Sequence, residues 1–415
     1  MKRIGILLLS LLLTLALAVP TFAQATKDIT VAVDGLPVQF DVKPTVQNGR
    51  ALVPFRALAE ALQVQVTWDG VSKTIRATAG ANVTTLQIGN KIALKNGSEV
   101  ELDVPPQVIN GRTLIPLRFF SETFQCQVDW QQGANAINIV SSAQPLAILG
   151  YYALGDQQTS SWTDLFGTPF PNVAVGNTDV VDRLALGWYS LDSQGNLLTQ
   201  SRTGWQRPDD YQQVLIAADR YQLDTEMVVH VTDQDNLLTN LLSNPQASQQ
   251  AVAAIAAEAV HYQGVNLDFE GLGLSESGAQ LTKVRDDFTN FVARLAKELQ
   301  QSNKQLALSL HAPNSAYQGY DYQRLGQLAD TIIVMAYDYG SKPEPLSMVS
   351  QAIEQARAVV PANKLMLGVS LPNETATSLP GKIRLAKQHH LKGIALWRLG
   401  VVSDEMWQQL RTTVR

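Results

Sequence analysis

The sequence predicts an α/β protein, a (β/α)8 TIM barrel preceded by a small duplicated α+β domain. The first observation is a segment at 48–56 that recurs at 110–118. The second is the alternation of apolar runs with helical patterns from residue 147 onward, which is typical of a parallel α/β sheet. The third is one apolar run that carries polar side chains on a single face. With 415 residues, of which 45% are hydrophobic and 17% charged, the chain is long enough for two or three domains.

Residues 1–23 have the features of an export signal. Lys2 and Arg3 give a positively charged start, 4–19 form an apolar run, and 21–23 form a small-residue cleavage site. The apolar run is short for a bilayer span, and so we expect cleavage and not a permanent anchor. We expect no membrane span after the signal is removed, and a secreted or cell-wall-associated protein.

Residues 27–142 contain an internal duplication with a lag of 62 residues. The sequence Asn-Gly-Arg-Ala-Leu-Val-Pro-Phe-Arg at 48–56 returns as Asn-Gly-Arg-Thr-Leu-Ile-Pro-Leu-Arg at 110–118. The same lag joins four further pairs: Glu60/Glu122, Val66/Val128, Trp68/Trp130 and Ile75/Ile137. Each unit predicts a turn at Asn-Gly, a short strand, a helix and a hairpin centred on its Trp. A regular twofold repeat indicates one module made of two interlocked halves.

These repeated residues resemble the copper amine oxidase N-terminal-like stalk domain, which accompanies many exported bacterial cell-wall proteins. The resemblance implies that 27–142 either binds the cell wall or only spaces the next domain from it. It does not imply copper, because the segment has no cluster of His, Cys or Met. Arg56 and Arg118 could bind an anionic polymer, but we favour a buried structural role for both. The only cysteine, Cys126, alternates with apolar neighbours, and so we expect a buried thiol.

A polar joint at 141–145 leads into a second domain at 146–415. Eight segments there have the character of parallel strands: 147–154, 183–191, 226–231, 264–270, 305–311, 331–337, 364–371 and 393–399. Helical patterns lie between most of them, and the clearest cover 245–261 and 279–300. Eight strands in about 270 residues is the size of one (β/α)8 barrel, whose active site lies at the carboxyl ends of its strands. A doubly wound open sheet is the alternative.

The segment 263–270, Gln-Gly-Val-Asn-Leu-Asp-Phe-Glu, alternates polar and apolar residues in the manner of a β-strand. Asn266, Asp268 and Glu270 therefore project from one face, while the apolar residues between them face a covering layer of helices. Carboxylates at the end of a buried strand are costly unless they are paired or used in chemistry. These side chains could instead cap a neighbouring helix or pair with Arg.

This strand closely resembles the signature strand of family 18 glycoside hydrolases, the chitinase-like enzymes. Three other strand ends agree with that family: Met335, Tyr337 and Asp338 match its Met-x-Tyr-Asp element, Trp397 matches its sugar-binding Trp, and Tyr151 lies in a Gly-Tyr-Tyr segment of strand one. The Asn-containing strand and 188–195 are most similar to spore-cortex-lytic and related bacterial members. Those members act on N-acetylglucosamine linkages in peptidoglycan.

The resemblance implies a retaining O-glycosyl hydrolase in which the 2-acetamido group of the substrate replaces the protein nucleophile. Glu270 would be the general acid and then the general base. Asp268 would orient the acetamide N–H and stabilise the cationic intermediate. Tyr337 would donate to the acetamide oxygen and Trp397 would stack on the sugar. The other expected substrate contacts are Asn266, Met335, Asp338 and Tyr151.

Two positions depart from the all-acidic pattern of that family. Gln263 stands where the series normally begins with Asp, but its parity points it away from the barrel centre. Asn266 faces inward, where it could hydrogen-bond Asp268 without repelling it. We therefore expect Asp268 to stay ionised more readily than in an all-Asp series. Burial and the charge of Asp268 should raise the pKa of Glu270 toward neutrality.

Other functions stay open at this point. A chitinase or chitooligosaccharide hydrolase would use the same chemistry, and an inactive chitinase-like lectin would keep the fold without turnover. The presence of both Asp268 and Glu270 argues against the lectin. The repeat module could also be the working part, with the barrel as a spacer.

Composition excludes several other classes of function. A net charge of −5 and a pI near 5.6 give no electrostatic reason to expect nucleic acid or an anionic membrane as a partner. We expect no metal and no cofactor, because the five histidines are scattered along the chain and no glycine-rich phosphate loop is present. The expected partner is a polysaccharide, peptidoglycan or chitin-like, with the stalk domain on the cell wall.

Overall fold

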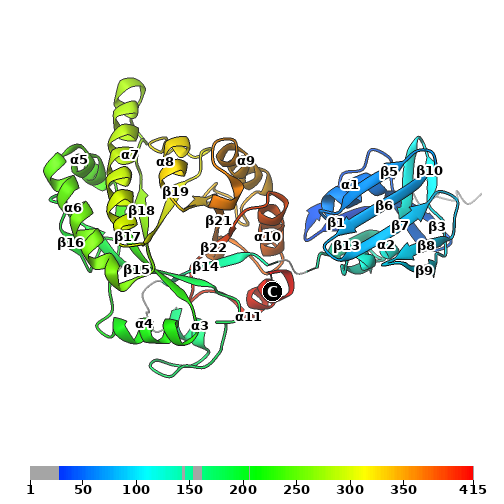
Figure 1. Ribbon diagram of the computed structural model, residues 1–415, viewed down its shortest axis with the longest axis horizontal. Coiled ribbons are helices and arrows are strands. Elements are labelled where there is room, and N and C mark those ends of the chain that lie inside the picture. Colours follow the sequence, from blue (N-terminus) through cyan, green and yellow to red (C-terminus); the bar gives the residue numbers. More distant parts are fainter. Residues whose placement is uncertain (1–27, 143–144, 153–160, 205, 415) are drawn as a thin grey trace, which may run out of the picture.

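The structure is a computed structural model that describes residues 28–142, 145–152, 161–204 and 206–414. The proposed export signal at 1–23 lies outside the described residues. Within them the chain forms a small β-rich stalk domain and a larger barrel, which lie beside one another along the long axis (Figure 1). In these ranges no helix has both the length and the apolar character needed to cross a membrane.

The eight predicted barrel strands are present, and they close into a ring. They are β14 (Ala147–Tyr152), β15 (Arg183–Leu191), β17 (Asp224–Thr232), β18 (Gly264–Glu270), β19 (Gln305–His311), β20 (Thr331–Met335), β21 (Leu365–Ser370) and β22 (Gly393–Trp397). Every neighbouring pair is parallel, and β14 pairs with both β22 and β15. The two-residue strand β16 (Leu197–Leu198) extends β15 at one end. Closure excludes the doubly wound open sheet and confirms the TIM-type barrel.

Helices cover the outside of the ring (Figure 1). They are α3 (Ser161–Phe166), α4 (Tyr211–Arg220), α5 (Leu237–Ser243), α6 (Pro245–Glu258), α7 (Gly278–Gln301), α8 (Tyr322–Leu328), α9 (Leu346–Arg357), α10 (Leu379–Gln388) and α11 (Asp404–Val414). Short 3-10 turns add η1 (Gln234–Asn236), η2 (Ala259–His261), η3 (Ala362–Lys364) and η4 (Leu371–Asn373). The helices predicted at 245–261 and 279–300 are confirmed as α6 with η2 and as α7. Helix α6 starts sharply because Asn244 accepts hydrogen bonds from two backbone N–H groups of its first turn and Pro245 follows.

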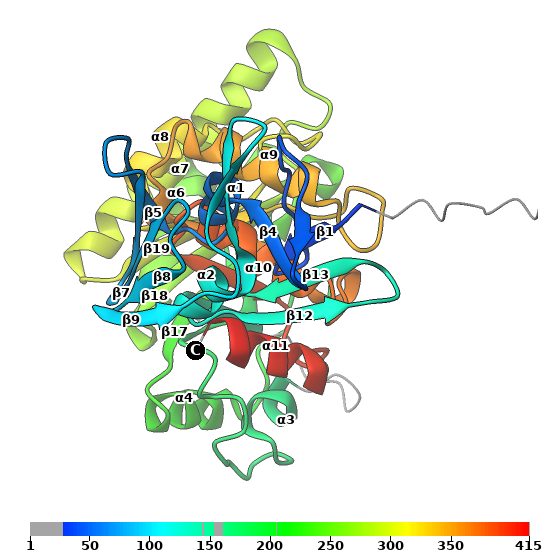
Figure 2. The same ribbon diagram turned by 90° about the vertical axis from the view of Figure 1, so that its right-hand side faces the viewer.

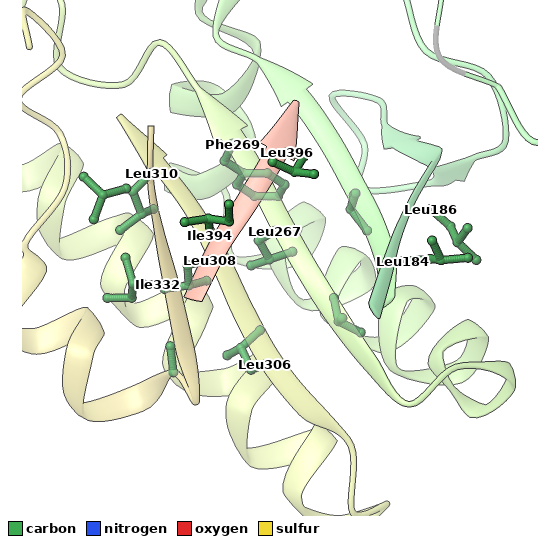
Figure 3. Close-up of a cluster of buried hydrophobic side chains, with 14 of the residues drawn as sticks. Leu184, Leu186, Leu267, Phe269, Leu306, Leu308, Leu310, Ile332, Ile394 and Leu396 are labelled. Atoms are coloured by element: carbon green, nitrogen blue, oxygen red, sulfur yellow. The ribbon is translucent and has the colours of Figure 1, made fainter. Parts of the chain in front are cut away.

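The barrel wall separates a large outer core from a small inner one. On the outer face, Leu267 and Phe269 of β18 lie beside Leu308 of β19, under the helices (Figure 3). The inner core is built mostly of smaller or narrower side chains: Leu149, Tyr151, Ala185, Val228, Ala307, Ile333, Met366 and Ala395. The alternation predicted for 263–270 is therefore confirmed. The modest inner side chains leave space along the axis for polar groups from β17, β18 and β19.

The stalk domain consists of two halves that share their sheets. Its elements are β1 (Thr30–Val33), β2 (Leu36–Pro37), β3 (Thr45–Gln47), β4 (Arg50–Pro54), α1 (Phe55–Ala61), β5 (Gln65–Asp69), β6 (Thr74–Ala79), β7 (Asn82–Gln87), β8 (Ile92–Lys95), β9 (Ser98–Glu101), β10 (Gln107–Ile109), β11 (Arg112–Pro116), α2 (Leu117–Thr123), β12 (Gln127–Gln131) and β13 (Ala136–Val140). Strand β1 of the first half pairs with β13 of the second, beside β12 (Figure 2). Strands β4 and β11 pair antiparallel, and Val53 lies opposite Ile115, its own repeat equivalent. A quasi-twofold axis therefore passes through this pair, and both halves contribute to one core.

Two predictions for the stalk domain have different outcomes. The buried structural role that we favoured for Arg56 and Arg118 is wrong, because both residues are exposed. Their neighbours Leu58 and Phe120 occupy the inner faces of α1 and α2, and so the arginines point outward. The prediction of a buried thiol is confirmed: Cys126 is 6% exposed, and burial raises its pKa to about 11.

Candidate active site

Asp268 and Glu270 lie at the carboxyl end of β18, in the mouth of the barrel. Asp268 is 3% exposed, and the side chain of Glu270 is 31% exposed. The two carboxyl groups project from the same face of the strand because they are two residues apart. Active sites of TIM barrels form at this end of the strands. The structure thus places the two central residues of the predicted site where a bound substrate can reach Glu270.

Two histidines from the neighbouring strands flank Glu270. Its Oε1 is 3.5 Å from Nε2 of His230 on β17, and its Oε2 is 4.0 Å from Nε2 of His311 on β19. The register of the barrel explains the first contact, since His230 lies directly opposite Asp268. The ring of His311 stacks on Tyr317, with centroids 3.9 Å apart and 19° between the planes. Glu270 is therefore held between a buried imidazole and a stacked one.

The pKa of Asp268 is raised to about 8. Burial is the main cause and the adjacent charge of Glu270 adds to it, while the charge of His230 opposes both. One carboxyl oxygen of Asp268, Oδ1, has no hydrogen-bond partner among the described residues. At neutral pH Asp268 therefore holds its proton, because the charge of His230 does not offset the loss of water around a buried carboxylate. Our comparison with an all-Asp series stays a prediction.

The pKa of Glu270 is lowered, although its burial alone would raise it. The hydrogen bond and charge of His230 outweigh burial, and His311 and Asp268 act in the same direction. The pKa of His230 is raised in turn: burial lowers it, but the hydrogen bond to Glu270 and the charges of Asp268 and Glu270 prevail. The prediction that the pKa of Glu270 rises toward neutrality is therefore wrong. The cation that lowers the pKa of Glu270 is His230, which belongs to the neighbouring strand β17.

Asp268 and Glu270 titrate as a coupled pair that holds one proton at neutral pH. In the unliganded protein this proton resides on Asp268, the more buried of the two. Glu270 is ionised and turned toward His230. A transfer of the proton between two adjacent carboxyl groups is then sufficient to convert Glu270 into an acid.

Asn266 faces the barrel interior, as its parity predicts, and is fully buried. Its Nδ2 donates to Oε2 of Glu226 at 3.0 Å, and its Oδ1 accepts from Oγ of Ser309 at 2.8 Å. Ser309 also bonds the hydroxyl of Tyr151, and Glu226 accepts from Arg183 at 2.9 Å. A polar chain of five side chains thus crosses the barrel. The partners of the Asn266 amide are therefore Glu226 and Ser309, whereas the sequence had offered Asp268 as a possible partner.

Aromatic residues surround the carboxyl pair on the other side of the mouth. The rings of Tyr151 on β14 and Trp397 at the end of β22 meet edge to face, with centroids 5.4 Å apart and planes at 68°. Tyr337, just after β20, is half-buried, and burial and the charge of Asp268 raise its pKa well above the usual value. Its phenol therefore stays protonated and able to donate. Met335 ends β20 and is 6% exposed.

Asp338 lies at the edge of this arrangement. Its backbone has φ of +63°, its N–H donates to Glu344 at 2.8 Å, and its Oδ1 accepts from Nδ2 of Asn373 at 3.0 Å. These contacts form a tight turn that follows Tyr337. Asp338 acts on the site through charge, because it opposes the lowering of the pKa of His311 by burial.

Gln263 lies at the opposite end of β18, where its side chain is exposed. Its Oε1 accepts hydrogen bonds from the N–H and the hydroxyl of Thr225, at 2.8 and 2.7 Å. This contact ties the start of β18 to β17 far from the barrel mouth. The outward parity predicted for Gln263 is therefore confirmed.

Sequence reasoning missed His230 and His311 as site residues. Both lie near the carboxyl end of a predicted strand, and their parity turns them inward. That combination is a usable signal in a predicted barrel, where strand ends converge even when residues are far apart in sequence. The wide spacing of the histidines along the chain hides this signal in the linear sequence.

His230, Asp268 and Glu270 could also be considered as metal ligands, since one possible ligand atom from each lies within 4.8 Å of the others. A proton on Asp268 and the charge of His230 beside Glu270 already offset the negative charge of the two carboxyl groups without a metal ion. We expect dialysis against EDTA to leave hydrolysis of a chromogenic N-acetylglucosamine substrate unchanged. Loss of activity that added Zn²⁺ or Mg²⁺ restores would show instead that the three residues hold an ion.

His230→Gln should raise the pKa of Glu270, because it removes the cation that stabilises the carboxylate. Protonation of Glu270 in addition to Asp268 takes away the base form of the pair, so activity falls below that pKa. The acidic limb of kcat/KM against pH should therefore move to higher pH. The matched control is His261→Gln, at an exposed residue of η2. An unchanged acidic limb in His230→Gln would contradict the assigned contact.

The comparisons with known proteins agree with the geometry. Residues 32–139 match the family described as copper amine oxidase N-terminal domain. Among curated proteins, YdhD of Bacillus subtilis (strain 168), described as a candidate sporulation-specific glycosylase, is 31% identical over 147 residues, which are 32% of this chain and 33% of YdhD. The chain spans 33% to 44% of the length of the curated relatives it matches.

Solved structures share the fold of the barrel. A class V chitinase from Pseudomonas fluorescens Pf-5 is 19% identical, with a TM-score of 0.53 over 64% of this chain and 99% of that one. The spore cortex-lytic enzyme SleL of Bacillus cereus is 16% identical, with a TM-score of 0.53 over 66% of this chain and 76% of that one. The family described as glycosyl hydrolases family 18 matches residues 148–373, more than half of the chain. The chain therefore belongs to family 18 of the glycosyl hydrolases.

Proposed function

We propose that the protein is an exported, retaining glycoside hydrolase that cleaves β-linked N-acetylglucosamine in cell-wall glycan. The acetamido group of the substrate would serve as the nucleophile. The observation that carries this proposal is the carboxyl pair of β18: Asp268 and Glu270 lie two residues apart, couple electrically and share one proton.

The position of this pair argues against ordinary two-carboxylate hydrolysis. Such enzymes place their carboxyl groups on opposite sides of the sugar, about 5–5.5 Å apart for retention and about 6.5–9.5 Å apart for inversion. Here both groups come from one face of one strand. A carboxylate oxygen of Asp268 lies within 4.8 Å of a carboxylate oxygen of Glu270. Asp268 lies deeper in the barrel than Glu270, and both would face a bound sugar from the same side. The nucleophile is therefore best supplied by the substrate.

The chemistry follows from the location of the proton. As the acetamido oxygen attacks the anomeric carbon, positive charge develops beside Asp268 and favours its ionised form. The shared proton then moves to Glu270, which donates it to the glycosidic oxygen as the bond to the anomeric carbon breaks. Glu270 is left as an anion beside His230, and it can accept a proton from the water that opens the cyclic intermediate. Two displacements at one carbon give retention of configuration.

The aromatic residues have roles suited to holding the sugar. Tyr337, which keeps its proton, would donate to the acetamido oxygen and direct its attack. Trp397 would stack on the apolar face of the sugar, with Tyr151 supporting its ring from the side. Met335 and Asp338 would line the ends of the binding site. Asn266 would lie beneath the sugar-binding site and hold β18 in place through its hydrogen bonds to Glu226 and Ser309.

Two observations favour a cell-wall polymer over chitin. The curated relative YdhD is described as a candidate sporulation-specific glycosylase. The connection between β21 and β22 contains only η4 and α10, so no inserted subdomain walls the substrate groove in this segment. An open groove suits a cross-linked polymer. The stalk domain would hold the protein on the wall.

The test is product analysis with residues 24–415. The protein is incubated separately with purified peptidoglycan and with chitin oligomers, and mass spectrometry identifies the new reducing ends. NMR of the first products reports whether the β configuration is retained. We expect N-acetylglucosamine reducing ends from peptidoglycan, in the β form. Preferred turnover of chitin oligomers would select the chitinase, and glycan binding with no turnover would select the lectin.

The mechanism can be tested independently of the preferred polymer with a substrate that lacks the acetamido group. A chromogenic glycoside whose 2-acetamido group is replaced by hydroxyl should not be hydrolysed, because it has no internal nucleophile. Hydrolysis of that analogue at a similar rate would contradict substrate-assisted catalysis even if the polymer assignment is correct.

A further inference from the structure

The stalk domain has two pockets that its internal repeat relates to one another. The Trp130 pocket has a volume of about 260 Å³ and includes Arg50, Asp103, Arg118, Glu122 and Trp130. The Trp68 pocket has a volume of about 560 Å³ and includes Arg112, Asp41, Arg56, Glu60 and Trp68. Each member of one set has its equivalent in the other at the lag of 62 residues. The two pockets are therefore copies of one arrangement.

Each pocket is assembled from both halves of the repeat. Arg50 belongs to the first half, but it enters the Trp130 pocket and pairs there with Asp103 of the second half at 2.6 Å. Arg112 crosses in the opposite sense and pairs with Asp41 in the Trp68 pocket. The quasi-twofold pairing of β4 with β11 produces this exchange. Neither half alone contains a complete pocket.

The residues that define the two pockets agree between the halves more closely than several buried pairs do. All five pairs of residues that define the pockets are identical in type, and all ten residues are exposed. By contrast, three buried pairs differ: Leu58/Phe120, Ala59/Ser121 and Val64/Cys126. Packing constrains buried residues more than exposed ones. Some buried pairs are identical as well, such as Leu52/Leu114 and Ile75/Ile137. Packing does not account for identity at exposed positions, which indicates that something outside the domain contacts these residues.

The tryptophans are the apolar part of each pocket. Trp68 is 44% exposed and Trp130 is 37% exposed, and each lies in the first strand of its hairpin. Neither is part of the stalk core. An indole exposed at the same place in both halves is an available surface for a flat apolar partner.

The charges around the tryptophans disfavour an anionic ligand. In the Trp68 pocket the cations Arg56 and Arg112 are balanced by Asp41 and Glu60. The Trp130 pocket has two arginines against three acids: Glu101, Asp103 and Glu122. A net charge of zero or −1 gives no field that attracts a polyanion. Paired guanidinium and carboxylate groups instead offer donors and acceptors together, which suits hydroxyl and amide groups.

We propose that the two pockets are equivalent subsites for neutral hexosamine residues of the glycan. Each indole would stack on the apolar face of one sugar, and the surrounding ion pair would bond its hydroxyl or acetamido groups. A polymer of repeating sugars can occupy both subsites at once, so binding would be bivalent. This inference rests on the proposed function only in taking the substrate of the barrel as the polymer that the stalk holds.

The test compares retention on insoluble polymer for Trp68→Ala, Trp130→Ala and the double variant. All are made in full-length protein with Glu270→Gln, so that the polymer is not degraded during the measurement. Each single variant should bind purified peptidoglycan more weakly. The double variant should lose about 10²-fold or more in affinity, because a bivalent contact is removed. Ile92→Ala is the matched control, since Ile92 is 41% exposed on β8 and outside both pockets.

Further measurements keep the inference open to refutation. Arg56→Gln with Arg118→Gln provides a second pair of exposed substitutions if a Trp variant fails to fold, as judged by circular dichroism. Soluble N-acetylglucosamine tetramer should compete with the polymer. Wild-type retention of the folded double variant would overturn the proposal. So would retention that depends on wall teichoic acid or on bound protein and is insensitive to the tetramer.

The inference and the proposed function can fail separately. With Glu270 restored, the double variant should hydrolyse a small chromogenic substrate at the wild-type rate. A barrel without turnover, together with Trp-dependent retention, would remove the proposed function and leave the subsites. An active barrel with Trp-independent retention would leave the proposed function and remove the subsites.

Discussion

Glu270→Gln should lower kcat by ~10²–10⁴-fold, the usual value of general acid–base catalysis, and leave KM and folding nearly unchanged. The amide keeps the shape of the carboxyl group and can still contact His230. It cannot carry the proton that Asp268 releases, so the leaving oxygen departs without protonation. The measurement is steady-state hydrolysis of a chromogenic N-acetylglucosamine substrate, with circular dichroism as the check on folding.

A matched substitution separates this effect from a general loss of charge. Glu298→Gln makes the same chemical change at an exposed position of α7, and it should have wild-type kinetics. If Glu270→Gln retained the wild-type rate, Glu270 would not be the acid. The proton would then have to come from another group in the mouth of the barrel.

Asp268→Asn should lower kcat by ~10²–10³-fold, as expected when one electrostatic stabiliser of a charged transition state is removed. Asn has neither the proton that Glu270 needs nor the negative charge that would stabilise the cationic intermediate. In the wild-type protein kcat/KM should fall as pH rises through about 8, because the pair then loses its shared proton. A kcat/KM profile of the residual activity should lack this basic limb. An identical limb in the variant would assign it to another group.

The same substitution should stabilise the fold, with a pH dependence of known sign. The pKa of Asp268 is raised from its ordinary value of 3.8 to about 8 in the native state, so the native protein binds the extra proton between these values. Stability associated with this proton is complete below about pH 4 and is lost as pH rises to about 8. Asp268→Asn should therefore raise Tm, and by more at pH 8 than at pH 5. A Tm gain that does not grow with pH would contradict the raised pKa.

Most of the barrel could be predicted from sequence because its signals are local. Strand β18 was predicted at its observed bounds from alternation alone, and α7 from apolar residues at helical spacing. The strands predicted at 331–337 and 393–399 both run two residues past the observed ends, and the first is instructive. Strand β20 ends at Met335, two residues early, because Asp338 adopts a positive φ and the chain turns there. This turn is held by the hydrogen bond from the N–H of Asp338 to Glu344, and the residues of the strand itself do not indicate it.

The electrostatics of the site could not be predicted in the same way. The pKa of Glu270 depends on His230, which is 40 residues away in sequence and becomes a neighbour only through the register of β17 with β18. Asn266 was placed correctly by parity, but its partners Glu226 and Ser309 belong to other strands. The exposure of Arg56 and Arg118 was missed because a repeated residue can be repeated for binding as well as for packing.

The polar chain through the barrel has a consequence for how the fold selects its pairing. Hydrophobic side chains alone oppose a sliding of β18 by one residue, but they discriminate less against a sliding by two, which keeps the same residues on each face. A shift of two residues would place Gly264 or Asp268 where Asn266 now bonds Glu226 and Ser309, and both hydrogen bonds would be lost. The hydrogen bonds of Asn266 therefore favour one alignment of β17, β18 and β19. That alignment is also the one that brings His230 beside Glu270, so the specificity of folding and the assembly of the catalytic pair depend on the same buried amide.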